Sequence, residues 1–118
     1  MFERYTEEAR RVIFFARYEA SLLGSPTLET EHLWLGLLRQ STKLVKRLAP
    51  KVTAEAIHER LARHGLNSER ISMATDVALS DEAKRALAAA AAEADQRGQK
   101  HITADYLVLA LLREEDPV

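Results

Sequence analysis

The side chains best suited to bind a metal ion or to move a proton near neutral pH are the histidines His32, His58, His64 and His101. His58 and His64 lie in a stretch with helical apolar spacing, as the two histidines of a zinc-protease helix do. They are six residues apart, however, so at about 100° per residue they point about 120° away from each other and cannot chelate one ion from that helix. We therefore expect no metal site, and we assign the histidines to solvent-exposed or helix-end positions.

Hydroxyl nucleophiles and nucleotide-binding loops are the other sources of chemistry to consider. None of the six serines stands in a Gly-x-Ser-x-Gly turn, and the histidines have no triad context. A Gly-x-x-x-x-Gly-Lys-Ser/Thr phosphate-binding loop is also missing, because the four glycines lie far apart in the chain. The chain cannot hydrolyse ATP by that route, and we expect neither enzymatic activity nor a cofactor.

Composition limits the remaining function classes. The 118 residues suit one domain, and the balance of 47% hydrophobic and 30% charged residues is that of a folded chain. Seventeen basic and eighteen acidic residues give a net charge of -1 without a concentrated basic face, so we expect no nucleic-acid partner. No stretch approaches the roughly 20 apolar residues that span a bilayer, so we expect no membrane partner. The lack of cysteine and of a signal-peptide-like start predicts a cytoplasmic protein.

An internal repeat is the strongest organising signal in the chain. A shift of 74 positions aligns residues 6–39 with residues 80–113 without a gap, and twelve of the 34 pairs are identical. The identities include acids, arginines, leucines and the pair Gly24 and Gly98. A match of this length indicates duplication of one structural unit.

Each unit is predicted to open with a long helix. Thr6 and Ser80 are each followed by two acids, which is typical of a helix start where a hydroxyl caps free amides and carboxylates oppose the dipole. Gly24 and Gly98 suit the left-handed position that ends a helix. A second, leucine-rich helix is then expected to begin near Thr30 in the first unit and near Thr103 in the second.

The first unit is expected to contain two further helices. A short one ends before Pro50, and another runs from the cap Thr53 to the next glycine. We place the first repeat at 2–65, a linker at 66–78 and the second repeat at 79–118. The second repeat is incomplete at its C-terminal end, since it has no counterpart of these two helices.

The first unit carries FERYTEEA at 2–9, Gly24, and TEHLWLGLL at 30–38. This pattern resembles the Clp amino-terminal (Clp repeat) domain, most closely that of the ClpC-type unfoldases. The resemblance covers nearly the whole chain, with 79–113 as the weaker copy, and implies an all-α fold, a pseudo-twofold helical bundle of two Clp repeats. In that family the domain sits on a ring-shaped ATPase that unfolds proteins for the ClpP protease, and it binds adaptors and substrates.

The resemblance implies a non-catalytic protein-interaction module with proteins as partners: Clp ATPase or protease subunits, adaptors and substrate proteins. Two alternatives concern whether the chain is part of a longer protein. The chain is either a domain of a longer unfoldase or a free-standing family member, and Met1 with the stop inside the second repeat favours the free-standing form. A third alternative is a free-standing regulator that uses the same scaffold to bind partners unrelated to proteolysis.

The resemblance also implies two binding pockets for phosphorylated arginine, each using a hydroxyl and a carboxylate. The matching positions are Thr6 with Glu31, and Ser80 with Asp105. A helix start offers amides and a hydroxyl to the phosphoryl group, while a carboxylate pairs with the guanidinium. The alternative is purely structural, because the same residues are ordinary helix caps and first-turn acids.

Two apolar features are open to a structural or a binding interpretation. The aromatic residues Phe14, Phe15 and Tyr18 correspond to three alanines in the second unit, and we expect them to fill the core opposite that smaller helix. Trp34 corresponds to a valine and is expected on the flank of its helix, as a partial core residue or an interface anchor.

Overall fold

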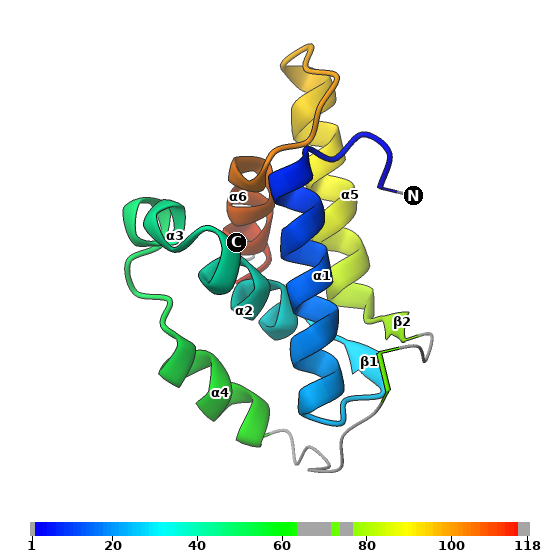
Figure 1. Cartoon of the computed structure of the whole chain (residues 1–118). Helices are drawn as coiled ribbons and strands as arrows, with labels where there is room; N and C mark the ends of the chain where they lie inside the picture. Colours follow the sequence, from blue (N-terminus) through cyan, green and yellow to red (C-terminus); the bar gives the residue numbers. More distant parts are fainter. Residues whose placement is uncertain (1, 64–71, 74–76, 116–118) are drawn as a thin grey trace.

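The computed structural model describes residues 2–63, 72–73 and 77–115, which form six helices and two short strands (Figure 1). In chain order the elements are α1 (Glu7–Leu22), β1 (Thr27–Leu28), α2 (Thr30–Gln40), α3 (Thr42–Leu48), α4 (Ala54–Arg63), β2 (Ala78–Leu79), α5 (Asp81–Gln96) and α6 (Ala104–Glu115). The all-α prediction is confirmed. The two strands are only two residues long each, and the sequence did not predict them.

The starts and ends of the two long helices repeat in atomic detail. The Thr6 hydroxyl accepts a hydrogen bond from the Ala9 amide at 3.1 Å, and the Ser80 hydroxyl accepts one from the Ala83 amide at the same distance. Gly24 and Gly98 both have a φ of 66°, in the left-handed region that only glycine adopts without strain. The predicted caps and glycine stops are therefore confirmed.

One ion pair is also repeated between the two units. Arg39 on α2 lies 2.5 Å from Glu19 on α1, and the corresponding Arg113 on α6 lies 3.5 Å from Glu93 on α5. Each pair joins the first helix of a unit to the second helix of the same unit. The two duplicated units thus share both the packing of their two helices and the ion pair between those helices.

Short strand contacts join the two units to each other. Strands β1 and β2 are parallel, with Leu28 opposite Leu79, and an isolated bridge pairs Tyr5 with Ile102. The 74-residue shift maps each of these contacts onto the other. Each unit's long helix therefore starts beside the second helix of the other unit. This crossing is what a pseudo-twofold arrangement requires, and the axis itself stays a prediction.

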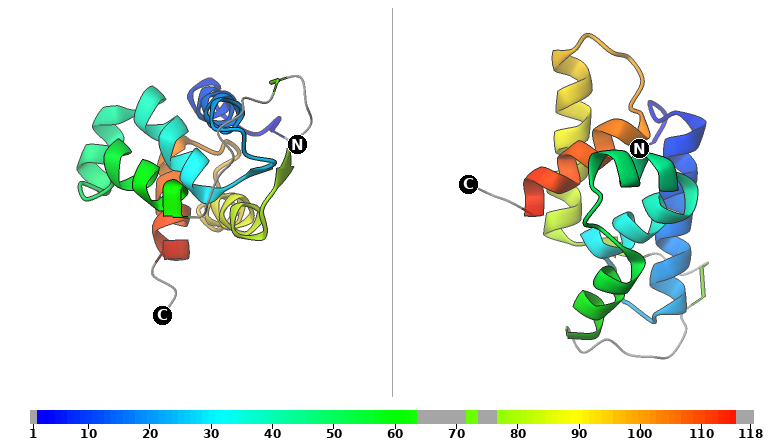
Figure 2. Two further views of the ribbon diagram at one scale, coloured as in Figure 1. Left: turned by 90° about the horizontal axis from the view of Figure 1, so that it is seen from below. Right: turned by 90° about the vertical axis from the view of Figure 1, so that its left-hand side faces the viewer.

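Helices α3 and α4 lie on the α2 side of α1, opposite α5, in Figure 1, and they face the viewer in the right-hand view of Figure 2. Val45 on α3 and both Ile57 and Leu61 on α4 are buried. The Thr53 hydroxyl caps α4 by accepting from the Ala56 amide at 3.1 Å, as predicted. The predicted end of this helix at Gly65 and most of the predicted linker 66–78 lie outside the described residues.

Packing corrects two expectations about large side chains. Trp34 is fully buried and is the largest side chain in the core, so its expected place on a helix flank is wrong. Phe14 is 53% exposed, and Phe15 and Tyr18 are half-buried, so the expectation that these aromatics fill the core is wrong for Phe14. The reason is the position on α1: the buried stripe runs through residues such as Val12 and Ala16, and Phe14 falls outside it.

Candidate protein-binding sites

The predicted hydroxyl and carboxylate residues come together in a different combination from the one expected. The Thr6 amide donates to the carbonyl of Ile102, just before α6, and the Ser80 amide donates to the carbonyl of Leu28, just before α2, both at 3.0 Å. Thr6 therefore lies beside the helix of Asp105, and Ser80 beside the helix of Glu31. The expected pairings of Thr6 with Glu31 and of Ser80 with Asp105 are wrong.

The direction of α2 explains this exchange. Ser41, directly after α2, donates to the Glu8 carboxylate at 2.7 Å, which places the end of α2 at the start of α1. Glu31, in the first turn of α2, lies at the other end of that helix. A first-turn acid and a cap within one unit are thus a helix length apart, and only the crossing between units brings each hydroxyl near a carboxylate.

At the Ser80–Glu31 site, Glu31 lines a small, strongly charged pocket, and Ser80 lies beside that pocket but is not part of its lining. The pocket has a volume of about 260 Å³ and is lined by Thr30, Glu31, Arg60, Glu82, Glu114 and Glu115. The Glu31 carboxylate is only 13% exposed and lies 3.6 Å from Nε of Arg60. Nη1 of Arg60 also donates to Glu115, so one guanidinium from α4 joins α2 to α6.

The Thr6–Asp105 site is more open. The Asp105 side chain is 54% exposed, and its nearest cation is Arg47 of α3 at 4.0 Å, with 70% of that side chain exposed. At this distance and exposure the ion pair is weak, and water readily replaces either partner. Asp105 therefore presents a carboxylate that an outside guanidinium can reach, next to the capped start of α1.

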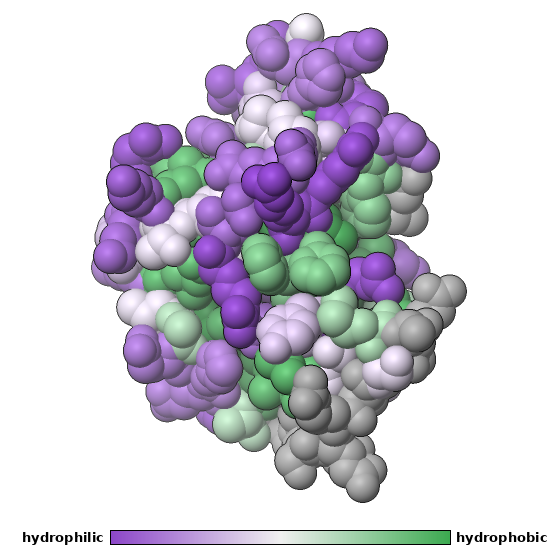
Figure 3. Space-filling view, in the orientation of Figure 1, coloured by the Kyte–Doolittle hydropathy of each residue, from purple (hydrophilic) through white to green (hydrophobic). Residues whose placement is uncertain are grey.

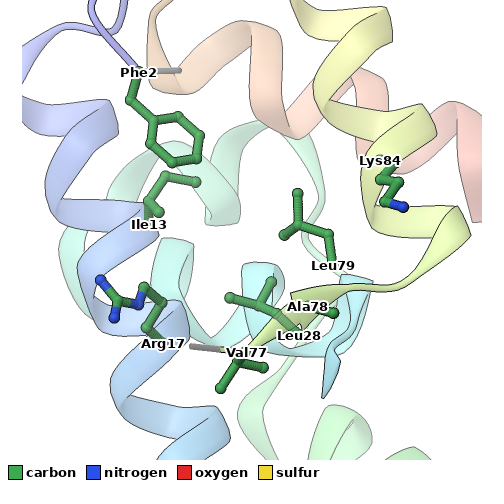
Figure 4. A pocket seen from close by; sticks show the side chains of 8 residues that line it. All are labelled: Phe2, Ile13, Arg17, Leu28, Val77, Ala78, Leu79 and Lys84. Atoms are coloured by element: carbon green, nitrogen blue, oxygen red, sulfur yellow. The ribbon is translucent and has the colours of Figure 1, made fainter. Parts of the chain in front are cut away.

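A third site is an apolar groove between α1 and α5, which we call the α1–α5 groove (Figure 4). Its volume is about 560 Å³. The lining is mostly apolar, and comprises Phe2, Ile13, Leu28, Val77, Ala78 and Leu79 together with the two basic residues Arg17 and Lys84. Figure 4 shows Arg17 on α1 and Lys84 on α5 at opposite sides of the hollow. Sequence reasoning missed this groove, because its wall combines segments far apart in the chain.

The apolar surface continues from the groove onto α1. A shallower hollow of about 270 Å³ is lined by Phe2, Arg10, Ile13, Phe14 and Arg17. Figure 3 shows an apolar patch over the middle of α1, with polar side chains above it. The exposed Phe14 ring thus extends the groove, and the charged residues that line the two hollows within the described ranges are basic.

His32 is a buried residue at a helix end, which is one of the two roles expected for the histidines. It sits in the first turn of α2, and its Nδ1 accepts the Glu29 amide at 2.9 Å. Burial lowers the pKa of His32 to about 4, although the nearby Glu29 and Glu19 carboxylates act in the opposite direction. The ring is neutral at pH 7 and serves as a cap.

Metal and membrane sites were searched among the described residues. No three histidine, aspartate or glutamate side chains in residues 2–63, 72–73 and 77–115 are arranged to hold a metal ion. Within the same ranges, none of the helices combines the length and the apolar character that crossing a bilayer requires.

Comparison with known proteins decides the family. Residues 4–118 match the Clp repeat (R) N-terminal domain. The chain belongs to this family. The sequence-based resemblance is therefore confirmed, and the geometry above is that of a Clp repeat domain.

Several relatives share this Clp repeat domain within much longer proteins. The chain is 31% identical over 121 residues to the chloroplastic chaperone protein ClpD2 of Oryza sativa subsp. japonica, and 33% identical over 123 residues to the chloroplastic chaperone protein ClpC1 of Arabidopsis thaliana. These alignments cover 99% and 100% of this chain but only 13% of each relative. The chain thus corresponds to a small part of those chaperones.

Solved structures show the same fold. The N-terminal domain of the caseinolytic protease associated chaperone ClpD from Arabidopsis thaliana matches with a TM-score of 0.75 and 30% identity, over 94% of this chain and 77% of that one. The Hsp104 N-terminal domain from Candida albicans matches with a TM-score of 0.70 over 97% and 77% of the two chains. The latter pair is 21% identical, so it supports the fold alone.

Proposed function

We propose that this Clp repeat domain is a non-catalytic protein-interaction module of the Clp protein-unfolding and proteolysis system, and that it binds substrates, adaptors or Clp subunits. The observation that carries the proposal is the α1–α5 groove, an open apolar hollow with basic side chains at its rim. The cytoplasmic location stays a prediction, because the relatives that state a compartment are chloroplastic.

The occupant that fits the α1–α5 groove is an extended protein segment with both apolar and acidic side chains. Apolar contact would supply most of the affinity, at about 25 cal/mol for each Å² of apolar surface removed from water. Arg17 and Lys84 supply the charge preference, since both are exposed and they are the charged residues among the described part of the groove lining. A segment with leucine and glutamate side chains meets both requirements, whereas a basic segment would be repelled.

A direct binding assay tests this proposal. The probe is a fluorescein-labelled peptide of alternating leucine and glutamate, measured by fluorescence anisotropy, with a leucine-lysine peptide for comparison. Binding of the acidic peptide should weaken about tenfold in the Arg17→Glu/Lys84→Glu variant, because two attractive charges at the rim become repulsive. A tenfold change in affinity corresponds to about 1.4 kcal/mol of binding free energy. The control Lys43→Glu/Arg63→Glu carries the same charge change at exposed positions outside the groove. Equal weakening in both variants would contradict a groove-specific role.

We further propose that the two exchanged pairs, Thr6 with Asp105 and Ser80 with Glu31, are sites for phosphorylated arginine in partner proteins. The carboxylate would pair with the guanidinium, and the helix start with its hydroxyl would receive the phosphoryl group. At the Thr6–Asp105 site, Arg47 lies 4.0 Å from Asp105 and would supply a cation for the phosphoryl group. This proposal is separate from the groove, because the two sites share no residue with its lining.

A further inference from the structure

We propose that Arg60 of α4 is a built-in occupant of the Ser80–Glu31 site, so that this site is closed to external guanidinium groups while the Thr6–Asp105 site is open. The inference rests on the proposed phosphoarginine function and specifies how its two sites differ. One arginine of the chain itself takes the place at Glu31 that the side chain of a partner would take.

Arg60 is held by a hydrogen bond to Glu115 and an ion pair with Glu31, while its buried Nε has no hydrogen-bond partner among the described residues. Its Nε lies 3.6 Å from the Glu31 carboxylate, and its Nη1 donates to Glu115, so the group is held between carboxylates from two helices. The side chains of Arg60, Glu31 and Glu115 are 30%, 13% and 26% exposed. An ion pair with so little exposure is less screened by water than the surface pairs elsewhere on this chain.

Helix α4 fixes Arg60 at this position. Ile57 and Leu61, on either side of Arg60 in sequence, are both 2% exposed and anchor the helix in the core. Arg60 is therefore presented at a local concentration that external ligands rarely match, since a tethered group acts at about millimolar effective concentration. A partner's arginine has to displace it before it can reach Glu31.

The charges around the pocket favour a guanidinium group. Glu82, Glu114 and Glu115 line the pocket in addition to Glu31, and Arg85 is already engaged with Glu114 at 2.7 Å. These carboxylates attract a guanidinium, so the pocket favours Arg60 as its occupant and Arg60 offsets part of their charge. By contrast, the Asp105 side chain is 54% exposed, and the Arg47 side chain 4.0 Å from it is 70% exposed.

Binding stoichiometry distinguishes the two sites. A peptide with one phosphoarginine is titrated by isothermal calorimetry into the chain, into Arg60→Gln, and into the matched control Arg63→Gln, which removes an exposed arginine of the same helix. We expect one site per chain in the wild type and in Arg63→Gln, and two in Arg60→Gln. Adding Asp105→Asn should abolish binding in the wild-type background but leave one site in the Arg60→Gln background.

Each outcome has one meaning. Two sites in the wild type, or one unchanged site in Arg60→Gln, would overturn the inference while leaving the proposed phosphoarginine function in place. No binding to any of the chains would overturn that function, and the inference with it. Glu115→Gln provides a second test, because it removes one partner of Arg60 without changing Glu31. The affinity of the Glu115→Gln variant for the peptide at the Ser80–Glu31 site should rise above that of the wild type, but by a smaller factor than in Arg60→Gln. An unchanged affinity would contradict the closure by Arg60.

Discussion

Replacing His32 with glutamine should remove a specific part of the acid sensitivity of folding. The His32 ring is completely buried, and its Nδ1 accepts a hydrogen bond from the Glu29 amide. The folded state therefore favours the neutral form of the ring. A glutamine at the same first-turn position can accept that amide through its side-chain oxygen. The variant therefore keeps the helix cap but has no group that titrates at this position.

The magnitude follows from the lowered pKa of His32. The pKa falls from 6.5 to about 4 on folding, so the unfolded chain takes up the proton first as the pH falls. The stability linked to the neutral ring is fully present above pH 6.5 and is lost between about pH 6.5 and 4. At about 1.4 kcal/mol per pKa unit, the loss is about 2 kcal/mol at pH 5 and about 3 kcal/mol at pH 4.

Urea unfolding at a series of pH values measures this effect. Between pH 7 and pH 5 the free energy of unfolding of the wild type should fall by about 2 kcal/mol more than that of His32→Gln. The variant His58→Gln, which removes an exposed histidine, is the control and should follow the wild-type curve. If the wild-type and His32→Gln curves stay parallel over this range, His32 titrates as a solvated histidine and the argument from burial is refuted.

Three smaller predictions concern backbone positions, each checked by urea unfolding at pH 7. Gly36→Ala should destabilise the chain by about 2 kcal/mol despite the better helix propensity of alanine, since its Cβ would lie 2.3 Å from the Val12 carbonyl oxygen; unchanged stability would mean that α1 and α2 can separate freely. Gly98→Ala should cost only about 1 kcal/mol, because its Cβ meets open space and the strain comes from the positive φ alone; a loss as large as that of Gly36→Ala would contradict this. Thr6→Ala should cost about 1 kcal/mol through loss of the α1 cap, and a neutral effect would show that water replaces the hydroxyl.

The local features of this fold could be predicted from the sequence. The caps Thr6 and Ser80 and the stops Gly24 and Gly98 depend on residues within one or two helical turns, and all four were placed correctly. The repeat also fixed the family resemblance, because its motif is continuous in sequence. Such features need no knowledge of how the helices are arranged in space.

The candidate sites depend on how the helices are arranged in space, and the sequence alone was insufficient to predict that arrangement. The partner of Glu31 is decided by the crossing of Leu28 with Leu79, which joins segments about 50 residues apart and has no local signal. The contact of Arg60 with Glu31 likewise depends on where α4 packs. A signal did exist for His32, because an acceptor three residues after Glu29 is the spacing of a capping box.

The burial of large side chains was also beyond sequence reasoning. Trp34 and Phe14 each lie in a helix of mixed apolar and polar residues, and several faces of each helix contain apolar residues. Which face meets the core is set by neighbouring helices, so Trp34 is fully buried while Phe14 is 53% exposed. The exposed ring then becomes part of the surface next to the α1–α5 groove.

The most direct test of membership in the Clp proteolytic system is a quantitative mass-spectrometric pull-down from the native host, with the wild-type chain and the Arg17→Glu/Lys84→Glu variant as baits. The account predicts that Clp ATPase, protease or adaptor subunits, or substrates of that system, are enriched with the wild type and reduced with the variant. Enrichment of unrelated proteins alone, or equal enrichment of Clp proteins by both baits, would contradict it.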